Sequence, residues 1–193
     1  MLQLPWKRTH LWIVDERRVD PEDDRSNFKM IKETLVASLR QPDPRANVLD
    51  LQYALTPIAD ATLSRWAFSG FCVRTRKDAS LTAIGPQGEV KLPNPSHLKP
   101  ESDWPAEAWY AYELELKDGT TAGIAVIDHP RNPPSLWHNH RDVRMLNPCI
   151  VAPDKVVLKK GQPLVLRYRV VTHDGETPRF LIKALAREFR GDE

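Results

Sequence analysis

Proline is the residue type that most constrains this chain. The sequence has 17 prolines against 8 glycines, and the prolines are spread from Pro5 to Pro178. Because proline lacks an amide hydrogen and its ring clashes with the preceding helical turn, few positions are left for long helices. This distribution predicts short strands that are joined by proline-rich turns.

Alternating apolar and polar residues support this prediction in three stretches. Residues 48–58, 109–129 and 163–176 place apolar side chains at every second position, a period that is typical of half-buried strands. The middle stretch contains the dipeptide Asp-Gly at 118–119, which predicts a hairpin with a type I′ turn. In the third stretch Arg167 and Arg169 fall on the polar side, so we expect both to face solvent. The pattern indicates antiparallel strands with one buried and one solvated face.

Only the C-terminal end of the chain has helical spacing. Segments 68–76 and 80–93 are further predicted strands, and the proline-rich segment 93–108 is predicted to be a long loop. Residues 177–190 predict a helix, with Thr177 as its cap and Pro178 at its first position. We therefore expect a single domain over residues 1–193, mainly β, that forms an antiparallel β-sandwich and ends in one helix.

Charge and composition argue against several classes of function. The formal net charge is +2 and the basic residues are scattered, so no nucleic acid is expected as a partner. No apolar run approaches the roughly 20 residues of a membrane helix, and the N-terminus does not resemble a signal peptide. We expect no membrane partner and a cytoplasmic location. Cys72 and Cys149 lie far apart and are interpreted as ordinary thiols. No phosphate-binding glycine loop is present, and no cofactor is expected.

Residues 128–142, DHPRNPPSLWHNHRD, concentrate the residue types that perform chemistry. Asp128 and His129 directly follow a predicted strand, where sites on rigid scaffolds are commonly built. His138 and His140 would share one face of an extended chain, an arrangement that suits metal binding or general acid–base catalysis. The alternative is that these histidines only form hydrogen bonds within a polar loop, and no third metal ligand is fixed by the spacing.

Trp137 and Arg74 allow two interpretations each. The indole of Trp137 either stacks against the apolar face of a sugar ring or anchors the loop to the core. Arg74 lies where an apolar strand approaches its rim, so it either binds a ligand or forms a surface salt bridge. The sequence leaves both pairs of alternatives open.

Four motifs resemble, in order, a known family. GFCVR, GIAVIDHPRNPPSLWHNHRD, MLNP and LKKGQPLVLRYRVVTHDGE are similar to the methane oxygenase PmoA family of bacterial proteins, over about residues 48–190. The family's Asp-His-Pro-x-Asn-Pro is complete from Asp128 to Pro133, whereas its upstream His-His-x-x-Leu-Trp is reduced to RTHLW. The resemblance implies a β-supersandwich of the galactose mutarotase type, and it leaves open that the chain lacks the family's N-terminal strands.

The same resemblance implies where a site would be. In folds of that type, histidines and carboxylates on a concave sheet face bind a sugar and move protons on it, although fold alone does not fix function. The cluster implied here consists of His10, Arg74, Asp128, His129, His138 and His140. We expect the catalytic residues to be His138, His140 and Asp128, and the substrate-binding residues to be His10, Arg74, His129, Trp137 and Arg141. No metal ligand is assigned.

Three hypotheses about function follow. The first is a protein that binds or processes a carbohydrate or sugar derivative, a small-molecule ligand, with His138 or His140 as general acid or base. The second is a non-catalytic β-sandwich module that binds a ligand or a partner, and assembly into a homo-oligomer is left open. The third is a metal-dependent oxidoreductase in which His138, His140 and a carboxylate form a facial triad.

Overall fold

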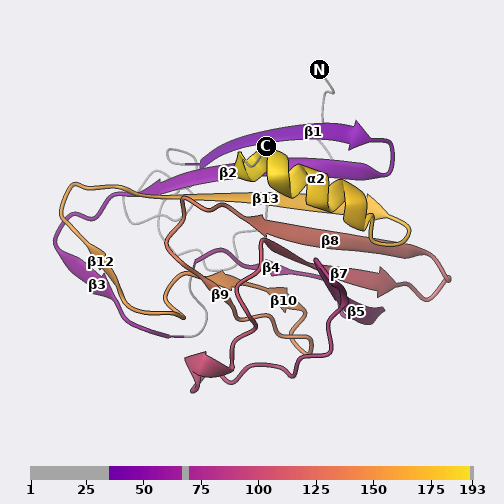
Figure 1. Ribbon diagram of the computed structural model, residues 1–193, viewed down its shortest axis with the longest axis horizontal. Helices are drawn as coiled ribbons and strands as arrows, with labels where there is room; N and C mark the ends of the chain where they lie inside the picture. The colour runs from indigo at the N-terminus through magenta and orange to yellow at the C-terminus, as the bar shows by residue number, and fades with distance from the viewer. Residues whose placement is uncertain (1–34, 67–69, 192–193) are drawn as a thin grey trace, which may run out of the picture.

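The fold is built on one large antiparallel sheet. The structure, a computed structural model, describes residues 35–66 and 70–191. Seven strands form the sheet in the order β1-β2-β13-β8-β7-β5-β6, and each neighbouring pair is antiparallel (Figure 1). The strands are β1 Leu35–Asp43, β2 Ala46–Leu55, β5 Ser80–Gly85, β6 Gly88–Glu89, β7 Trp109–Glu115, β8 Thr121–Asp128 and β13 Leu164–Asp174.

Shorter elements cover the two faces of this sheet. Helix α2, Arg179–Arg190, lies along β13 on one face, while β4, β9 and β10 lie away from it, below β13 and β8 in Figure 1. Three two-stranded sheets pair β3 with β12, β4 with β10 and β9 with β11. These elements are β3 Ala61–Leu63, β4 Val73–Arg74, β9 Leu136–Trp137, β10 Met145–Leu146, β11 Pro148–Cys149 and β12 Val156–Leu158, and a 3-10 turn, η2, spans Pro100–Ser102.

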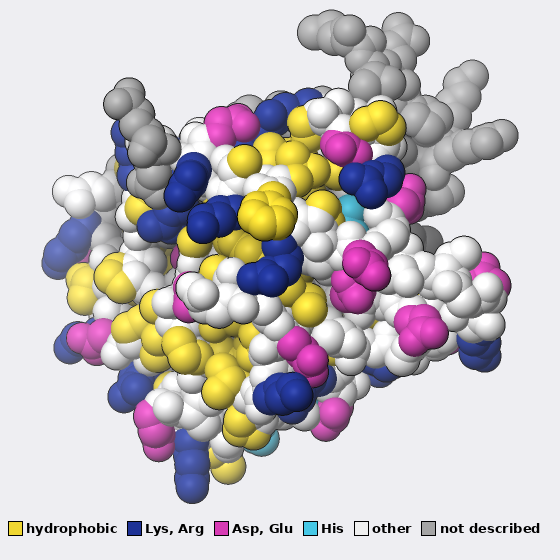
Figure 2. Space-filling model, turned by 45° about the vertical axis from the view of Figure 1, so that its right-hand side comes forward, with side chains coloured by type: hydrophobic (Ala, Val, Ile, Leu, Met, Phe, Trp, Pro, Cys, Tyr) yellow, Lys and Arg dark blue, Asp and Glu magenta, His cyan; other side chains and the backbone are white. Residues whose placement is uncertain are grey.

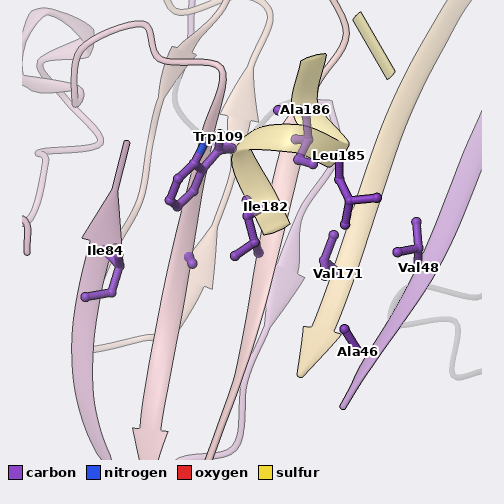
Figure 3. Close-up of a cluster of buried hydrophobic side chains, with 11 residues drawn as sticks. Ala46, Val48, Ile84, Trp109, Val171, Ile182, Leu185 and Ala186 are labelled. Atoms are coloured by element: carbon purple, nitrogen blue, oxygen red, sulfur yellow. The ribbon is translucent and has the colours of Figure 1, made fainter. Parts of the chain in front are cut away.

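The central strands are buried on both faces. On one face, side chains of β7, β8 and β13 pack against α2; the cluster in Figure 3 includes Trp109, Ile127, Val171, Ile182 and Leu185. On the other face, the alternate side chains pack against β9 and β10; this cluster includes Tyr110, Tyr112, Val126, Trp137 and Leu146. The expectation of one solvated face is therefore wrong for these strands, because the helix and the short strands supply a second cover.

Arg169 shows the consequence of that second cover. The alternation predicts a solvated side chain, but the residue is 3% exposed and lies between the sheet and α2. Its Nε and Nη2 atoms donate to the two carboxylate oxygens of Asp50 at 2.5 and 2.8 Å, and its Nη1 donates to the main-chain oxygen of Leu185 at 2.7 Å. The prediction that Arg169 faces solvent is wrong because a pattern of alternation cannot show what packs on the polar side.

The turn of the β7–β8 hairpin differs from its prediction. Gly119 has a φ of 81°, its N–H donates to the oxygen of Leu116, and the N–H of Leu116 donates to Thr120. Among the described residues Arg144 is the one non-glycine residue with positive φ, so Asp118 does not adopt the conformation that a type I′ turn requires. The hairpin is confirmed, but glycine occupies the left-handed position of a longer turn.

The start of the C-terminal helix also differs. The helix begins at Arg179 rather than at residue 177, Pro178 occupies the cap position, and no side chain caps the helix. Thr177 does not act as the cap, since its backbone N–H donates to the Glu113 carboxylate at 2.6 Å. The helix ends at Arg190 and is followed by the C-cap Gly191, which has the left-handed conformation that glycine adopts without strain.

The predicted fold class is confirmed at the level of its main features. The described chain is mainly β, with a large antiparallel sheet and one helix at its C-terminal end. No helix in the described ranges has both the length and the apolar character needed to cross a membrane. Figure 2 shows basic and acidic side chains interspersed over one face of the molecule, in keeping with a nearly balanced net charge.

Candidate functional site

The segment 128–142 leaves the sheet at the end of β8, and Asn132 fixes the path that it takes. The Asn132 amide donates through Nδ2 to the main-chain oxygen of Arg167 at 2.7 Å and accepts through Oδ1 from the Arg167 N–H at 2.8 Å. The side chain thus makes the two hydrogen bonds that a strand residue would make. It prolongs the β8–β13 pairing, which otherwise ends at Asp128 opposite Tyr168.

Asp128 carries a carboxyl group that is 8% exposed and accepts two hydrogen bonds. Asn132 Nδ2 donates to Oδ1 at 2.7 Å, and the Ser135 hydroxyl donates to Oδ2 at 2.5 Å. Burial raises the pKa of Asp128 above its usual value, although Ser135, Asn132 and Arg190 each oppose this shift. A carboxyl group in such an environment can gain and lose a proton nearer to neutral pH than an ordinary aspartate.

His129 follows Asp128 and turns its ring toward the end of α2. The ring meets Phe189 edge-on at a centroid distance of 5.0 Å, and Nδ1 accepts a hydrogen bond from the backbone N–H of Arg131 at 3.0 Å. Burial is the largest cause that lowers the pKa of His129, and Arg167, Arg131 and Arg190 lower it further. The lowered pKa and the hydrogen bond that Nδ1 accepts both favour the neutral imidazole.

These residues line a pocket with a volume of about 290 Å³ at the exit of β8. Arg190, the last residue of α2, closes one side, and its Nη1 donates to the main-chain oxygen of Asp128 at 3.3 Å. The pocket is lined by Ala106, Glu107, Ala108, Asp128, His129, Pro130, Asn132, Pro133, Pro134, Ser135 and Arg190. Carboxyl, hydroxyl, amide and guanidinium groups thus occur together in one concave site, which is the usual place for a small-molecule ligand.

His138 and His140 lie elsewhere. His138 is fully buried, and its Nδ1 is 2.5 Å from Oδ1 of Asp103, whose side chain is fully buried as well. His140 is partly buried, its main chain pairs with Met145, and burial lowers the pKa of its imidazole. Neither histidine lines the pocket. Asp103 precedes His138 by 35 residues, within the long loop 93–108, so no local motif connects the two.

The structure decides between the two interpretations of Trp137. Its indole is 0% exposed, its Nε1 donates to the main-chain oxygen of Glu107 at 3.0 Å, and its ring meets Tyr110 edge-on at 5.1 Å. A fully buried ring has no face to offer to a sugar. Trp137 therefore anchors the segment to the core, and its predicted stacking role is wrong for that reason.

Two further predicted residues, Arg74 and Arg141, do not line the pocket. Arg74 is exposed on β4, where its backbone pairs with Met145. Arg141 donates its backbone N–H to Oδ1 of Asn94 at 2.8 Å. His10 lies outside the described residues. Of the six residues of the predicted cluster, the structure thus brings Asp128 and His129 together and separates them from Arg74, His138 and His140.

Ser135 and Arg190 are among the pocket residues that the sequence did not single out. Ser135 lies within the candidate segment 128–142. A serine between proline and leucine has no sequence feature that indicates a functional role, and only its contact with Asp128 shows one. Arg190 ends a correctly predicted helix, but only the packing of α2 on the sheet shows which strand end it meets. Within the described ranges, no group of three His, Cys, Asp or Glu side chains is arranged to hold a metal ion.

Comparison with known proteins places the chain in a different family from the one expected. The sequence matches, over residues 9–187, a family whose description is a family of unknown function, DUF6807. It is also 21% identical over 181 residues to a protein of Thermotoga maritima named 6-phosphogluconolactonase, an alignment that covers 94% of this chain and 70% of that protein. No solved structure matches the chain significantly.

The expected membership of the methane oxygenase PmoA family is therefore wrong, because the family match found is to DUF6807. The supersandwich of the galactose mutarotase type was inferred from that resemblance and has no support from a structural match. The DUF6807 family model matches residues 9–187, which is most of the chain, and the chain therefore belongs to this family of unknown function.

Proposed function

We propose that this protein binds a sugar derivative in the pocket at the exit of β8 and acts on it there. The observation that carries the proposal is the buried Asp128 carboxyl group beside the Ser135 hydroxyl and the Arg190 guanidinium in one concave site. Sugar derivatives present many hydroxyl groups, each a donor and an acceptor, and such a set of groups can satisfy both. The similarity to a protein named 6-phosphogluconolactonase supports the same class of ligand.

Within this proposal, Asp128 acts as general acid or base. Burial raises its pKa, which brings the carboxyl group closer to the range in which it exchanges a proton with a ligand hydroxyl or a water molecule. His129 orients the site rather than moving protons, since Nδ1 is occupied by the backbone of Arg131. His138 is too deeply buried to reach a ligand in this pocket, and it is assigned to the scaffold together with Asp103.

Ligand-induced stabilisation tests the proposal. Glucose, gluconate and gluconolactone should be titrated into the wild-type protein, Asp128→Asn and Asp142→Asn, and the melting temperature followed. Asp142 is an exposed aspartate of the same segment that does not line the pocket, so its variant is the matched control.

A ligand at a hundred times its Kd stabilises the folded state by about 2.7 kcal/mol. We expect the ligand to raise the melting temperature of the wild-type protein and of Asp142→Asn, and we expect no such increase for Asp128→Asn. If no compound raises the melting temperature, or if Asp128→Asn responds like wild type, the proposal is wrong.

A binding module without catalysis is the second candidate. The observation that favours it is that both carboxylate oxygens of Asp128 already accept hydrogen bonds from the protein, which suits a structural role. The two candidates differ in turnover. If gluconolactone binds but its hydrolysis rate equals the rate without protein, the module is favoured, whereas acceleration that Asp128→Asn abolishes favours the enzyme.

A further inference from the structure

The last turn of α2 brings a positive charge to the pocket. Arg190 lines it, and its Nη1 lies 3.3 Å from the main-chain oxygen of Asp128. A guanidinium group has five N–H donors in a planar fork, so it can hold a main-chain oxygen and an anion together. The geometry of this fork matches a carboxylate or a phosphate group better than it matches a neutral hydroxyl.

A buried arginine holds this turn of the helix in position. Arg169 is 3% exposed, binds Asp50 through two hydrogen bonds and donates to the main-chain oxygen of Leu185. Its guanidinium also lies 4.6 Å from the centre of the Phe189 ring, which in turn contacts His129. A continuous set of contacts therefore runs from the sheet through the end of α2 to the pocket wall. A ligand that binds Arg190 would meet a side chain whose helix is already fixed, which reduces the entropic cost of binding.

The charges around the pocket favour an anion. Burial is the largest cause that lowers the pKa of His129, and the guanidinium groups of Arg167, Arg131 and Arg190 lower it further, in keeping with positive charge beside the pocket wall. Burial raises the pKa of Asp128, so its negative charge is less strongly favoured than in solution. Glu107 also lines the pocket, and its carboxylate is suited to accept hydrogen bonds from ligand hydroxyl groups.

We propose that the pocket selects sugar derivatives that carry an anionic group, a carboxylate or a phosphate, and that Arg190 binds this group. The inference rests on the function proposed above and specifies the chemical class of its ligand. Arg190 is then the residue that determines specificity, while Arg169 is a positioning residue that acts through the helix.

The test compares one neutral and two anionic ligands. Glucose, gluconate and glucose 6-phosphate should be titrated by calorimetry into the wild-type protein, Arg190→Gln, Arg190→Lys and Arg187→Gln. Arg187 is exposed in the same turn of α2 and does not line the pocket, so its variant removes the same charge as a matched control. Circular dichroism and melting temperature confirm that each variant is folded.

We expect at least one anionic ligand to bind wild type and Arg187→Gln about tenfold or more tightly than glucose. Arg190→Gln should lose this preference, so that neither anion binds it more tightly than glucose does, and Arg190→Lys should retain part of it because it keeps the charge but not the fork. A preference for gluconate identifies a carboxylate ligand, and a preference for glucose 6-phosphate identifies a phosphate ligand.

Other outcomes overturn the inference, and they separate it from the proposed function. If glucose binds as tightly as both anions and Arg190→Gln changes nothing, the inference is wrong and the proposed sugar site stands. If none of the three ligands binds, the inference is wrong, and the proposed function is wrong as well if gluconolactone also leaves the melting temperature unchanged. If Arg190→Gln fails to fold, the anion affinity of the wild-type protein should be measured at several salt concentrations instead, as a test of the ionic contact. An anion affinity that is unchanged between about 0.02 and 0.5 M salt contradicts an ionic contact.

Discussion

At the scale of single residues, Asn132 does with its side chain what strand residues do with their backbone. Its amide forms one hydrogen bond to Asp128 and two to the main chain of Arg167, and the residue is 7% exposed. The sequence placed Asn132 inside a proline-rich loop and gave no sign of these three contacts. Removing a buried amide also leaves its partners without hydrogen bonds, which costs more than the loss of the bonds themselves.

We therefore expect Asn132→Ala to lower the free energy of unfolding by about 2–4 kcal/mol. The effect should be measured by urea denaturation. Asn47→Ala is the matched control, because Asn47 is an exposed asparagine of β2, and it should change the stability by less than about 0.5 kcal/mol. Equal effects of the two substitutions would contradict the role given to Asn132.

Single residues also show what the sequence could not reveal. The residue types in DHPRNPPSLWHNHRD indicated a candidate site in this segment, and two of its residues, Asp128 and His129, line the pocket. His138 and His140, the two histidines that the sequence predicts to be catalytic, lie outside the pocket. Burial and distant partners such as Asp103 decide the role of such residues. A residue's partner 35 positions away depends on tertiary packing, which no local spacing encodes.

At the scale of elements, the docking of α2 on the sheet joins stability to the candidate site. Alternation predicted the strands and helical spacing predicted the helix, but the face of the sheet that the helix would cover was not predictable. Arg169 shows which face α2 covers. It lies on the side of the sheet that the alternation predicts to be polar, and it binds both Asp50 and the backbone of the helix. The interaction is nearly excluded from water, with the Arg169 side chain 4% exposed and that of Asp50 27% exposed.

We expect Arg169→Met to destabilise the protein by about 3 kcal/mol, because it leaves Asp50 and a helix carbonyl without their donor. Arg167→Met, two residues earlier on the same strand, is the matched control. The hydrogen bonds between Arg167 and Asn132 are made by the Arg167 backbone, so the loss of its side chain should cost less than about 1 kcal/mol. Chemical denaturation measures both values. A cost for Arg169→Met no larger than for Arg167→Met would show that the ion pair does not hold the helix.

At the scale of the whole molecule, three histidines whose pKa values are lowered by burial make the stability sensitive to acid. Burial is the largest cause that lowers the pKa of His129, His140 and His173. Their folded-state pKa values lie below the value of about 6.5 that we expect for the unfolded chain. Unfolding therefore takes up protons as the pH falls below about 6.5, and stability decreases until the folded-state pKa values are passed.

The free energy of unfolding should accordingly be level between about pH 7 and 8 and decline below about pH 6.5. His173 is 3% exposed and contributes at most about 1.4 kcal/mol per pH unit to this decline. Urea denaturation from pH 7.5 to 5 measures the slope, and His173→Phe should make it shallower. Stability that rises as the pH falls through this range, or a slope that His173→Phe leaves unchanged, would contradict the assignment.

The central claim is that a sugar derivative binds at the exit of β8. Amide NMR of the labelled protein, titrated with gluconate and with gluconolactone, tests it most directly because it locates the ligand without a substitution. The account predicts saturable shifts of the backbone amides of the pocket-lining residues that carry an N–H, which are 106–108, 128, 129, 132, 135 and 190, and little change around His138 and His140. Saturable shifts that centre on His138 and His140, or spectra that neither compound changes, would contradict it.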